Sequence, residues 1–149
     1  INSKVRFYRK KAFLDIDMLF VSDMGETFRF FTTDDDADFS LLERKAMENI
    51  NKISAALVPL DKGLQVYTLR YTTDYASSLL LSEAMNKQIQ RKAGDDILIA
   101  IPSNSFFIVA EFNYYNERLI KHLIKYDTDP NRVSDAIYRR KEGIYMKMC

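Results

Sequence analysis

The sequence predicts an α+β fold in which about three helices pack on a central, mainly antiparallel sheet. Two short apolar runs, Ile97–Ile101 and Phe106–Ala110, are separated by the turn-forming segment Pro102–Ser105. Each run is too short for an independent helix and is rich in β-branched or aromatic residues, which indicates two strands joined as a hairpin. Their nearly continuous apolar character is typical of buried strands, so we expect this hairpin at the centre of the sheet. Apolar residues recur at helical spacing in three other segments, and the expected element order is ββαβαββαββ.

Length and composition favour a single α+β domain over residues 1–149. The chain has 149 residues, of which 47% are hydrophobic and 29% are charged. This composition supports a buried core and lies far from that of disordered chains. Because the chain starts with Ile1 rather than Met, a fragment of a longer protein is one interpretation.

The first elements are expected to be two strands and a helix. Alternating apolar and polar residues predict a strand over Ala12–Asp23, and after a tight turn a second strand over Thr27–Thr33. A capping box formed by Ser40 and Glu43 is expected to start the first helix, in which Ile50 continues the apolar stripe.

A strand and the longest helix are expected next. Leu64–Tyr71 alternates as a strand after a turn at Asp61–Gly63. A cap at Thr72–Asp74 then starts a helix from Tyr75 to Ala93, which Gly94 ends.

The C-terminal part is expected to contain a helix and a second hairpin. Asn113 can cap a helix over Tyr114–Tyr126, and Pro130 prevents its continuation. The segments Asp135–Arg140 and Ile144–Met148 then form the last hairpin.

Charge, apolar runs and cysteine content restrict the cellular setting. The formal net charge of +1 gives no overall attraction to nucleic acids or membranes. No apolar run approaches the roughly 20 residues that span a bilayer, and the carboxylates within Leu14–Phe20 are not typical of a signal peptide. Cys149 is the only cysteine, which excludes an internal disulfide and a cysteine-based zinc site. We therefore expect a cytoplasmic protein without a membrane partner, and a nucleic-acid partner is disfavoured.

Asp15 and Asp17 are two residues apart on the first predicted strand, so both carboxylates would project from the same face. Nucleotidyltransferases use such a pattern to hold a divalent cation. They also need a glycine-serine phosphate-binding turn upstream, where this chain has Arg9–Lys11. The solvated face of an edge strand explains the pair equally well, and a metal-dependent enzyme remains the alternative function.

A second acidic segment, Asp34–Asp38, has oxygen ligands at alternate positions, as a calcium-binding loop has. Phe39 stands at the position of the required glycine, and Lys45 at that of the bidentate glutamate. A solvated loop before a helix is the better interpretation, since negative charge favours the N-terminus of the helix.

The inventory of reactive side chains does not support common hydrolase or dinucleotide chemistry. His122 is the only histidine, so a triad of the usual kind cannot form. Ser103 and Ser105 lie in the predicted hairpin turn without a G-x-S-x-G elbow around them. The chain has only four glycines and no Gly-rich phosphate-binding motif. No catalytic residue, metal site or cofactor is therefore assigned from the sequence.

The last predicted hairpin combines basic and aromatic residues. The candidate binding residues are Tyr138, Arg139, Arg140 and Tyr145. They could contact phosphate or an acidic protein. Charged residues also commonly protect an edge strand from pairing with other chains, and this second interpretation is favoured.

Five stretches carry a resemblance: Ile1–Val21, Ala46–Ile53 (AMENINKI), Leu64–Tyr71 (LQVYTLRY), Asp95–Val109 (DDILIAIPSNSFFIV) and Val133–Gly143 (VSDAIYRRKEG). Taken together they resemble the C-terminal half of a family of uncharacterised bacterial proteins. Asn104 replaces the family's second serine after the proline, and Phe106 and Phe107 replace a histidine and a glutamate that often follow. If those polar groups carry an activity in the relatives, this chain is expected to have lost it. The resemblance implies a shared fold and a preceding half in the full-length chain.

We expect a non-enzymatic interaction or accessory domain that binds another protein or the N-terminal region of its own chain. The reason is a well-formed core without a convergent set of catalytic residues. The alternative is a metal-dependent nucleotide or nucleic-acid enzyme using Asp15 and Asp17. Nucleic-acid binding through Lys4–Lys11 and Arg139–Lys141 is a third interpretation, and the sequence does not define the oligomeric state.

Overall fold

The computed structural model describes residues 6–148, and the chain divides into two compact units. The N-terminal unit comprises residues 1–49 and the C-terminal unit residues 50–149, and each is described by itself. Lys4, the first residue of the nucleic-acid-binding interpretation Lys4–Lys11, lies outside the described residues. The same is true of Cys149, the only cysteine. The single-domain organisation expected from the sequence stays a prediction.

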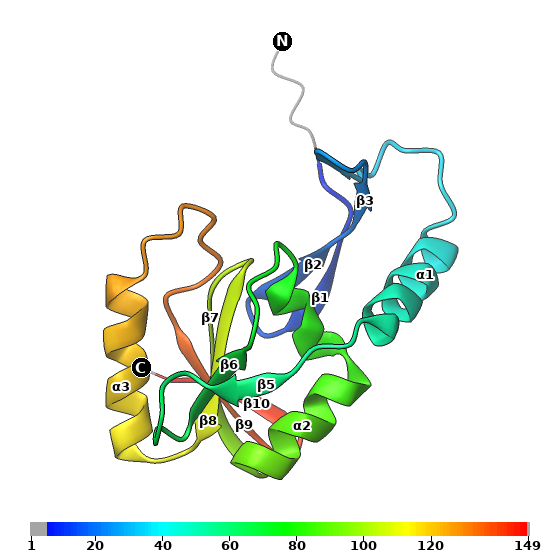
Figure 1. Cartoon of the computed structure of the whole chain (residues 1–149). Coiled ribbons are helices and arrows are strands. Elements are labelled where there is room, and N and C mark those ends of the chain that lie inside the picture. The colour runs from blue at the N-terminus through cyan, green and yellow to red at the C-terminus, as the bar shows by residue number, and fades with distance from the viewer. Residues whose placement is uncertain (1–5, 149) are drawn as a thin grey trace. The chain divides into compact units, whose positions relative to one another are not determined.

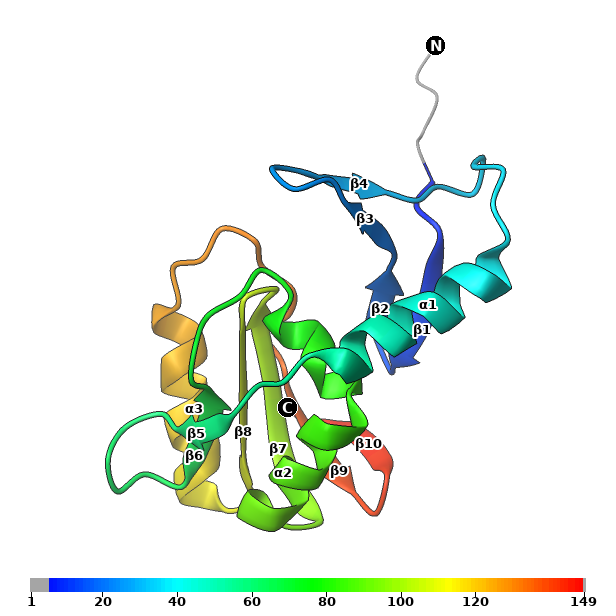
Figure 2. The ribbon, with the colours of Figure 1, turned by 45° about the vertical axis from the view of Figure 1, so that its right-hand side comes forward.

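The C-terminal unit is built on a six-stranded antiparallel sheet with the strand order β10-β9-β7-β8-β6-β5 (Figures 1 and 2). Its strands are β5 (Leu57–Pro59), β6 (Val66–Leu69), β7 (Asp96–Ser103), β8 (Phe106–Glu111), β9 (Ile137–Lys141) and β10 (Ile144–Lys147). Helices pack on this sheet, so the predicted α+β class is confirmed. The middle strands are β7 and β8, which confirms the expected central position of the apolar hairpin.

The middle strands are buried because apolar residues occupy both of their faces. Every residue from 97 to 103 on β7 and from 107 to 110 on β8 is buried. Successive side chains of a strand point to opposite faces of the sheet. Ala100 pairs with Ile108 on one face, and Ile99 pairs with Val109 on the other.

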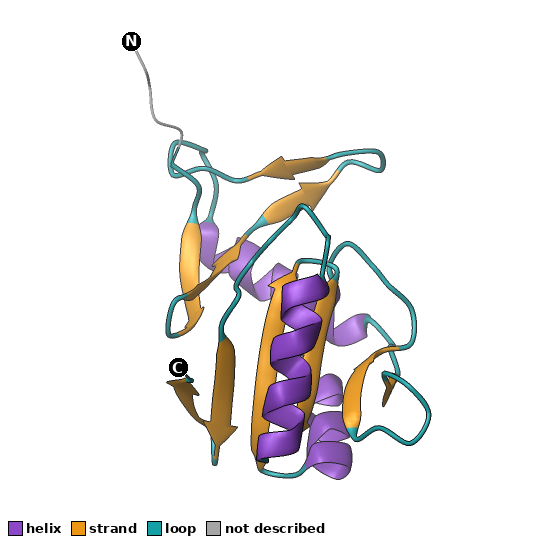
Figure 3. Cartoon of the chain, turned by 90° about the vertical axis from the view of Figure 1, so that its left-hand side faces the viewer, coloured by secondary structure: helices purple, strands orange, loops and turns teal. Residues whose placement is uncertain are grey.

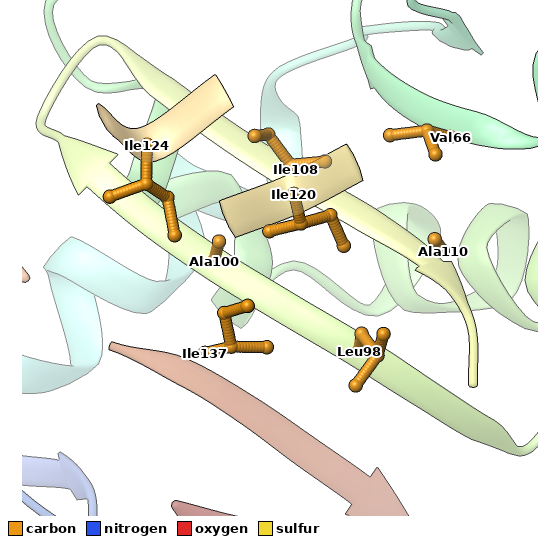
Figure 4. Close-up of a cluster of buried hydrophobic side chains, with 8 residues drawn as sticks. All are labelled: Val66, Leu98, Ala100, Ile108, Ala110, Ile120, Ile124 and Ile137. Carbon is orange, nitrogen blue, oxygen red and sulfur yellow. The ribbon is translucent and has the colours of Figure 1, made fainter. Parts of the chain in front are cut away.

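Helices cover both faces of the sheet. On one face, Ile120 and Ile124 of α3 (Tyr114–Tyr126) pack in a buried cluster (Figure 4). The other members of this cluster are Val66, Leu98, Ala100, Ile108, Ala110 and Ile137. The opposite face carries the short 3₁₀ helix η1 (Ala76–Leu81) and α2 (Glu83–Ala93), as Figure 1 shows. Among the helices of residues 6–148, none has the length and apolar character needed to cross a bilayer.

The caps of these helices confirm one expectation and correct another. The Asn113 side chain accepts a hydrogen bond from the Asn116 N–H at 2.8 Å, which confirms the predicted start of α3. The predicted continuous helix over 75–93 is wrong, because Ser82 is extended and caps a new helix. Its hydroxyl accepts from the Met85 N–H at 3.3 Å, and this local bond competes with helix continuation.

The last hairpin forms as expected. Glu142 and Gly143 join β9 to β10 with φ values of 51° and 78°, as a two-residue turn of type I′ requires. Strand β5 was not predicted, because it has three residues and ends in Pro59, which gives no strand pattern in the sequence.

The N-terminal unit contains two small antiparallel sheets and a helix (Figure 2). The elements are β1 (Arg9–Phe13), β2 (Ile16–Leu19), β3 (Val21–Asp23), β4 (Phe28–Phe30) and α1 (Phe39–Lys52). The predicted single strand over 12–23 is wrong, because the chain reverses at Leu14, whose φ is 46°. Pairing places Lys11 opposite Asp17, so cross-strand attraction favours the hairpin over one long strand.

Helix α1 does not start with the predicted capping box. The Asp38 carboxylate, rather than Ser40, accepts a hydrogen bond from the Leu41 N–H at 3.1 Å. Glu43 instead accepts hydrogen bonds from the Tyr8 hydroxyl and, at 3.0 Å, from Lys10. The Tyr8 ring also stacks on Phe39 at a centroid distance of 4.0 Å, so these contacts hold the first turns of α1 to the segment before β1.

Candidate interaction surface

Tyr138, the first of the predicted binding residues, is fully buried on β9. Its hydroxyl lies 2.9 Å from the Ser134 hydroxyl. A side chain enclosed in this way cannot contact a partner, so its assignment to a binding surface is wrong. The alternation of β9 could not reveal this burial, because both faces carry a buried residue, Ile137 on one and Tyr138 on the other.

Arg139 holds β9 to the neighbouring strand β7. Its Nε donates to one oxygen of Asp96 at 2.8 Å, and Nη2 donates to the other at 2.7 Å. The guanidinium also lies over the Phe112 ring, 3.7 Å from its centroid. Bidentate geometry and ring stacking are the contacts for which arginine is suited in a folded structure.

Arg140 and Tyr145 contact each other on the opposite face of the same hairpin. Nη1 of Arg140 donates to the Asn86 side-chain oxygen at 2.8 Å and to the Tyr145 hydroxyl at 3.3 Å. These bonds link β9 to α2 and β10. Together with Arg139, the two side chains are used mainly within the fold, which supports a structural role for the hairpin cations.

The Arg139–Asp96 pair predicts a specific loss of stability in acid. The hydrogen bonds from Arg139 lower the pKa of Asp96 below its usual range. A carboxylate with a lowered pKa stabilises the fold above its unfolded pKa of about 3.9. This contribution is present above the unfolded pKa and is lost as pH falls below it and through the lowered folded pKa.

We expect Asp96→Asn to melt about 2–4 °C below the unmodified protein at pH 7, because a partly exposed pair contributes modestly. This gap should close as pH is lowered toward 2, and thermal denaturation followed by circular dichroism at several pH values measures it. A gap that stays constant over this range would contradict the assignment.

The structure separates Asp15 and Asp17 rather than presenting them together on one strand. Asp15 lies in the turn between β1 and β2, whereas Asp17 lies on β2. The Asp17 carboxylate is 3.7 Å from Arg9 Nη1 and 3.8 Å from Lys11 Nζ. Both cations would compete with a metal ion for this carboxylate. Over residues 6–148, no three or more His, Cys, Asp and Glu side chains are grouped so as to hold a metal.

The acidic segment 34–38 serves the loop before α1. Asp35 accepts hydrogen bonds from the Thr32 N–H at 2.7 Å and from Arg29 at 2.6 Å, and Asp38 caps the helix. The Thr32 bond is the main cause of a lowered pKa at Asp35. These bonds support the interpretation as a loop before a helix over that as a calcium site.

A polar cluster at the turn of the central hairpin was not anticipated from the sequence. The Ser105 hydroxyl donates to Asp129 at 2.5 Å and lies 3.3 Å from the Ser103 hydroxyl. The Ser77 hydroxyl donates to the Ser103 carbonyl oxygen at 2.5 Å. Ser105 and Asp129 are 24 residues apart, so no local pattern could connect them.

This cluster is unsuited to nucleophilic catalysis. The Ser105 hydrogen bond lowers the pKa of Asp129, which makes this carboxylate a weak base. A general base near neutral pH needs a pKa close to 7. His122, the only histidine, instead packs against Tyr126 on α3 at a ring distance of 4.6 Å. Ser105 therefore holds the hairpin turn to the 127–136 loop, and Ser77 holds the same turn to η1.

Two shallow depressions lie on the C-terminal unit, with volumes of about 450 and 360 Å³. The first is lined by Gly63, Leu64, Gln65, Asn113, Tyr115 and Asn116, and the second by Ser54, Ala55, Ala56, Arg70, Tyr71 and Gln88. Neither lining contains a carboxylate or a histidine. The usual pairs of acid and base groups for catalysis are therefore not brought together in either depression.

The N-terminal unit presents an unusually apolar surface. Phe20 is its one buried hydrophobic residue among those described, and α1 has no buried residue. Nine large apolar side chains of this unit are exposed: Phe7, Leu14, Leu19, Val21, Met24, Phe28, Phe30, Leu41 and Met47. Phe28 and Phe30, at 42% and 43% exposure, are two residues apart on β4, so they project from the same face.

Comparisons of this chain with protein-family models, curated proteins and solved structures give no match. The resemblance described from the sequence therefore stays a prediction.

Proposed function

We propose that this protein is a non-enzymatic interaction domain, and that the exposed apolar side chains of the N-terminal unit bind a protein partner. The observation that carries the proposal is the contrast within this unit. Among residues 6–49 of this unit, one hydrophobic residue is buried, whereas nine large apolar ones are exposed. Neighbouring exposed apolar side chains, such as Phe28 and Phe30 on one face of β4, are typical of protein-interaction sites.

The secondary structure of the N-terminal unit adds to this argument. Isolated two-stranded sheets are only marginally stable in water, and this unit has two of them. Covering their apolar side chains would contribute about 25 cal/mol for each Å² removed from water. A partner that covers β3 and β4 would therefore stabilise both the complex and the unit itself.

Two substitutions on β4 and a matched pair on β10 test the proposal. Phe28→Ser/Phe30→Ser removes two apolar side chains spaced two residues apart on a strand. Ile144→Ser/Met146→Ser is the control, since these residues have the same spacing and exposures of 68% and 43%. Far-UV circular dichroism verifies that each variant is folded.

The partner is first captured with a photo-reactive phenylalanine analogue at position 28 and identified by mass spectrometry. Calorimetry with the purified partner then gives the affinity of each variant. We expect Phe28→Ser/Phe30→Ser to bind at least about tenfold more weakly, as for the loss of central apolar contacts, and the control to bind normally.

Equal affinity of the β4 variant and the unmodified protein would overturn the proposal. A magnesium-dependent rise in melting temperature that is lost in Asp15→Ala would instead favour the metal-dependent alternative.

A further inference from the structure

We infer that the outer face of α3 binds an acidic segment of a protein partner. This inference deepens the proposed interaction function, on which it rests, by naming a second contact surface and the chemistry it recognises. The outer face is defined here by the cations Arg118, Lys121 and Lys125 and the tyrosines Tyr114, Tyr115 and Tyr126.

The buried stripe of α3 determines which residues form this outer face. Asn116, Ile120 and Ile124 are buried against the sheet, so residues on the opposite side of the helix face outward. Figure 3 shows α3 in front of the sheet of its unit, with its outer side toward the viewer. Within the C-terminal unit, this face is therefore open to a partner.

The three cations form one row along the helix. Lys121 and Lys125 are spaced by one turn, and Arg118 precedes Lys121 by three residues, so neighbouring members lie close together. Glu117 is the only acidic residue of α3, and it lies 3.3 Å from Lys121 Nζ. Neither Arg118 nor Lys125 takes part in an ion pair among the described residues. The Arg118 guanidinium and the Lys125 ammonium are therefore available to a carboxylate of a partner.

The tyrosines flank the cations at both ends of the helix. Tyr114 and Tyr115 are 82% and 69% exposed at the start of α3, and Tyr126 is 63% exposed at its end. The Lys125 ammonium lies 5.6 Å from the Tyr126 ring centroid. Tyrosine and arginine are enriched among the side chains that dominate binding energy, because each combines a large contact area with hydrogen-bonding groups.

Helix α2 also exposes cations but lacks the aromatic residues of α3. Its exposed residues include Lys87, Arg91 and Lys92, but none of its eleven residues is aromatic. Of the two α-helices that pack on this sheet, α2 and α3, only α3 therefore combines cations with large exposed tyrosines.

The number of charges favours an acidic peptide over a nucleic acid. From Tyr114 to Lys125 the face is about 16 Å long. Each strand of duplex DNA carries one charge for each 3.4 Å or so, so about five phosphates of the facing strand would meet three cations, one of which is paired with Glu117. An extended peptide of about five residues spans the same length. Two carboxylates in such a segment match Arg118 and Lys125, since Lys121 is already paired with Glu117, and its apolar side chains can pack on the tyrosines.

Fluorescence anisotropy with defined probes tests the inference. The probe is a fluorescein-labelled peptide of ten residues composed of aspartate, glutamate and leucine. The matched neutral peptide has asparagine and glutamine at the acidic positions, and a labelled ten-nucleotide single strand represents nucleic acid. The full chain is titrated into each probe at low and high salt.

We expect the acidic peptide to bind more tightly than the neutral one, and to bind more weakly at high salt. Arg118→Ala/Lys125→Ala should lower its affinity about tenfold, as for the loss of two charge contacts. Tyr115→Ala/Tyr126→Ala should also weaken binding, whereas the control Lys87→Ala/Arg91→Ala on α2 should bind within about twofold of the unmodified protein. Each substitution introduces alanine, which favours the helix.

Equal affinities for acidic and neutral peptides would overturn the inference, as would equal losses in the α3 and α2 variants. Tighter binding of the oligonucleotide, with the same dependence on Arg118 and Lys125, would assign the face to nucleic acid instead. Phe28→Ser/Phe30→Ser should bind the acidic peptide normally. Failure of the peptide to bind is therefore distinguishable from failure of the apolar surface to bind its partner.

Discussion

Replacing Leu98 by alanine is expected to lower the free energy of unfolding by about 3–5 kcal/mol, near the upper end for such a substitution. Leu98 is fully buried in β7, between β8 and β9. It belongs to the cluster beneath α3, and the residue opposite it on β8 is Ala110. Because the neighbour on β8 is alanine, no large side chain on that strand can move to fill the cavity.

Urea denaturation of the Leu98→Ala variant measures this loss at constant m value. Typical domains have a total stability of about 5–15 kcal/mol, so this loss is a large fraction of the total. Ile144→Ala is the matched control, because Ile144 is 68% exposed in the same unit. Its loss should be below about 1 kcal/mol. Comparable losses in the two variants would show that this cluster is not the centre of the core.

Gly94→Ala is expected to cost about 1–3 kcal/mol although there is space for the added methyl group. Gly94 ends α2 with φ 87° and ψ −162°, a conformation essentially restricted to glycine. A Cβ at this position would have no neighbour within 4 Å. The cost therefore arises from the backbone conformation that leads the chain from α2 into β7.

Thermal and urea denaturation of Gly94→Ala check this expectation against Lys87→Ala, an exposed position in the middle of the same helix. Lys87→Ala should change stability by less than about 0.5 kcal/mol. If Gly94→Ala were as stable as the unmodified protein, the connection would tolerate an ordinary conformation at this residue.

The roles of both positions can be recognised in the sequence. The burial of Leu98 follows from the apolar run that contains it, and Gly94 is recognisable as the residue that ends a helix. The start of α3 at Asn113 was also predicted, because a capping side chain and the N–H it satisfies lie within one turn. Such local signals act between neighbours and can be identified without knowledge of the fold.

The candidate surfaces were less accessible to sequence reasoning. The four residues selected on the last hairpin include buried Tyr138, and Arg139 is occupied by Asp96, which is 43 residues away. The aromatic and cationic residues of α3 were not selected from the sequence as a binding surface. Whether such a side stays uncovered depends on which elements pack around it, and this information is distributed over the whole chain.

The apolar central hairpin, the α+β class and the helix that Asn113 caps could be predicted from local patterns, because burial and capping involve a few neighbouring residues. The reversal at Leu14, the division of a predicted helix at Ser82 and the contact of Ser105 with Asp129 are evident only in the folded chain. At each of these places the local sequence is compatible with more than one conformation. Contacts with other parts of the chain select the conformation that is observed.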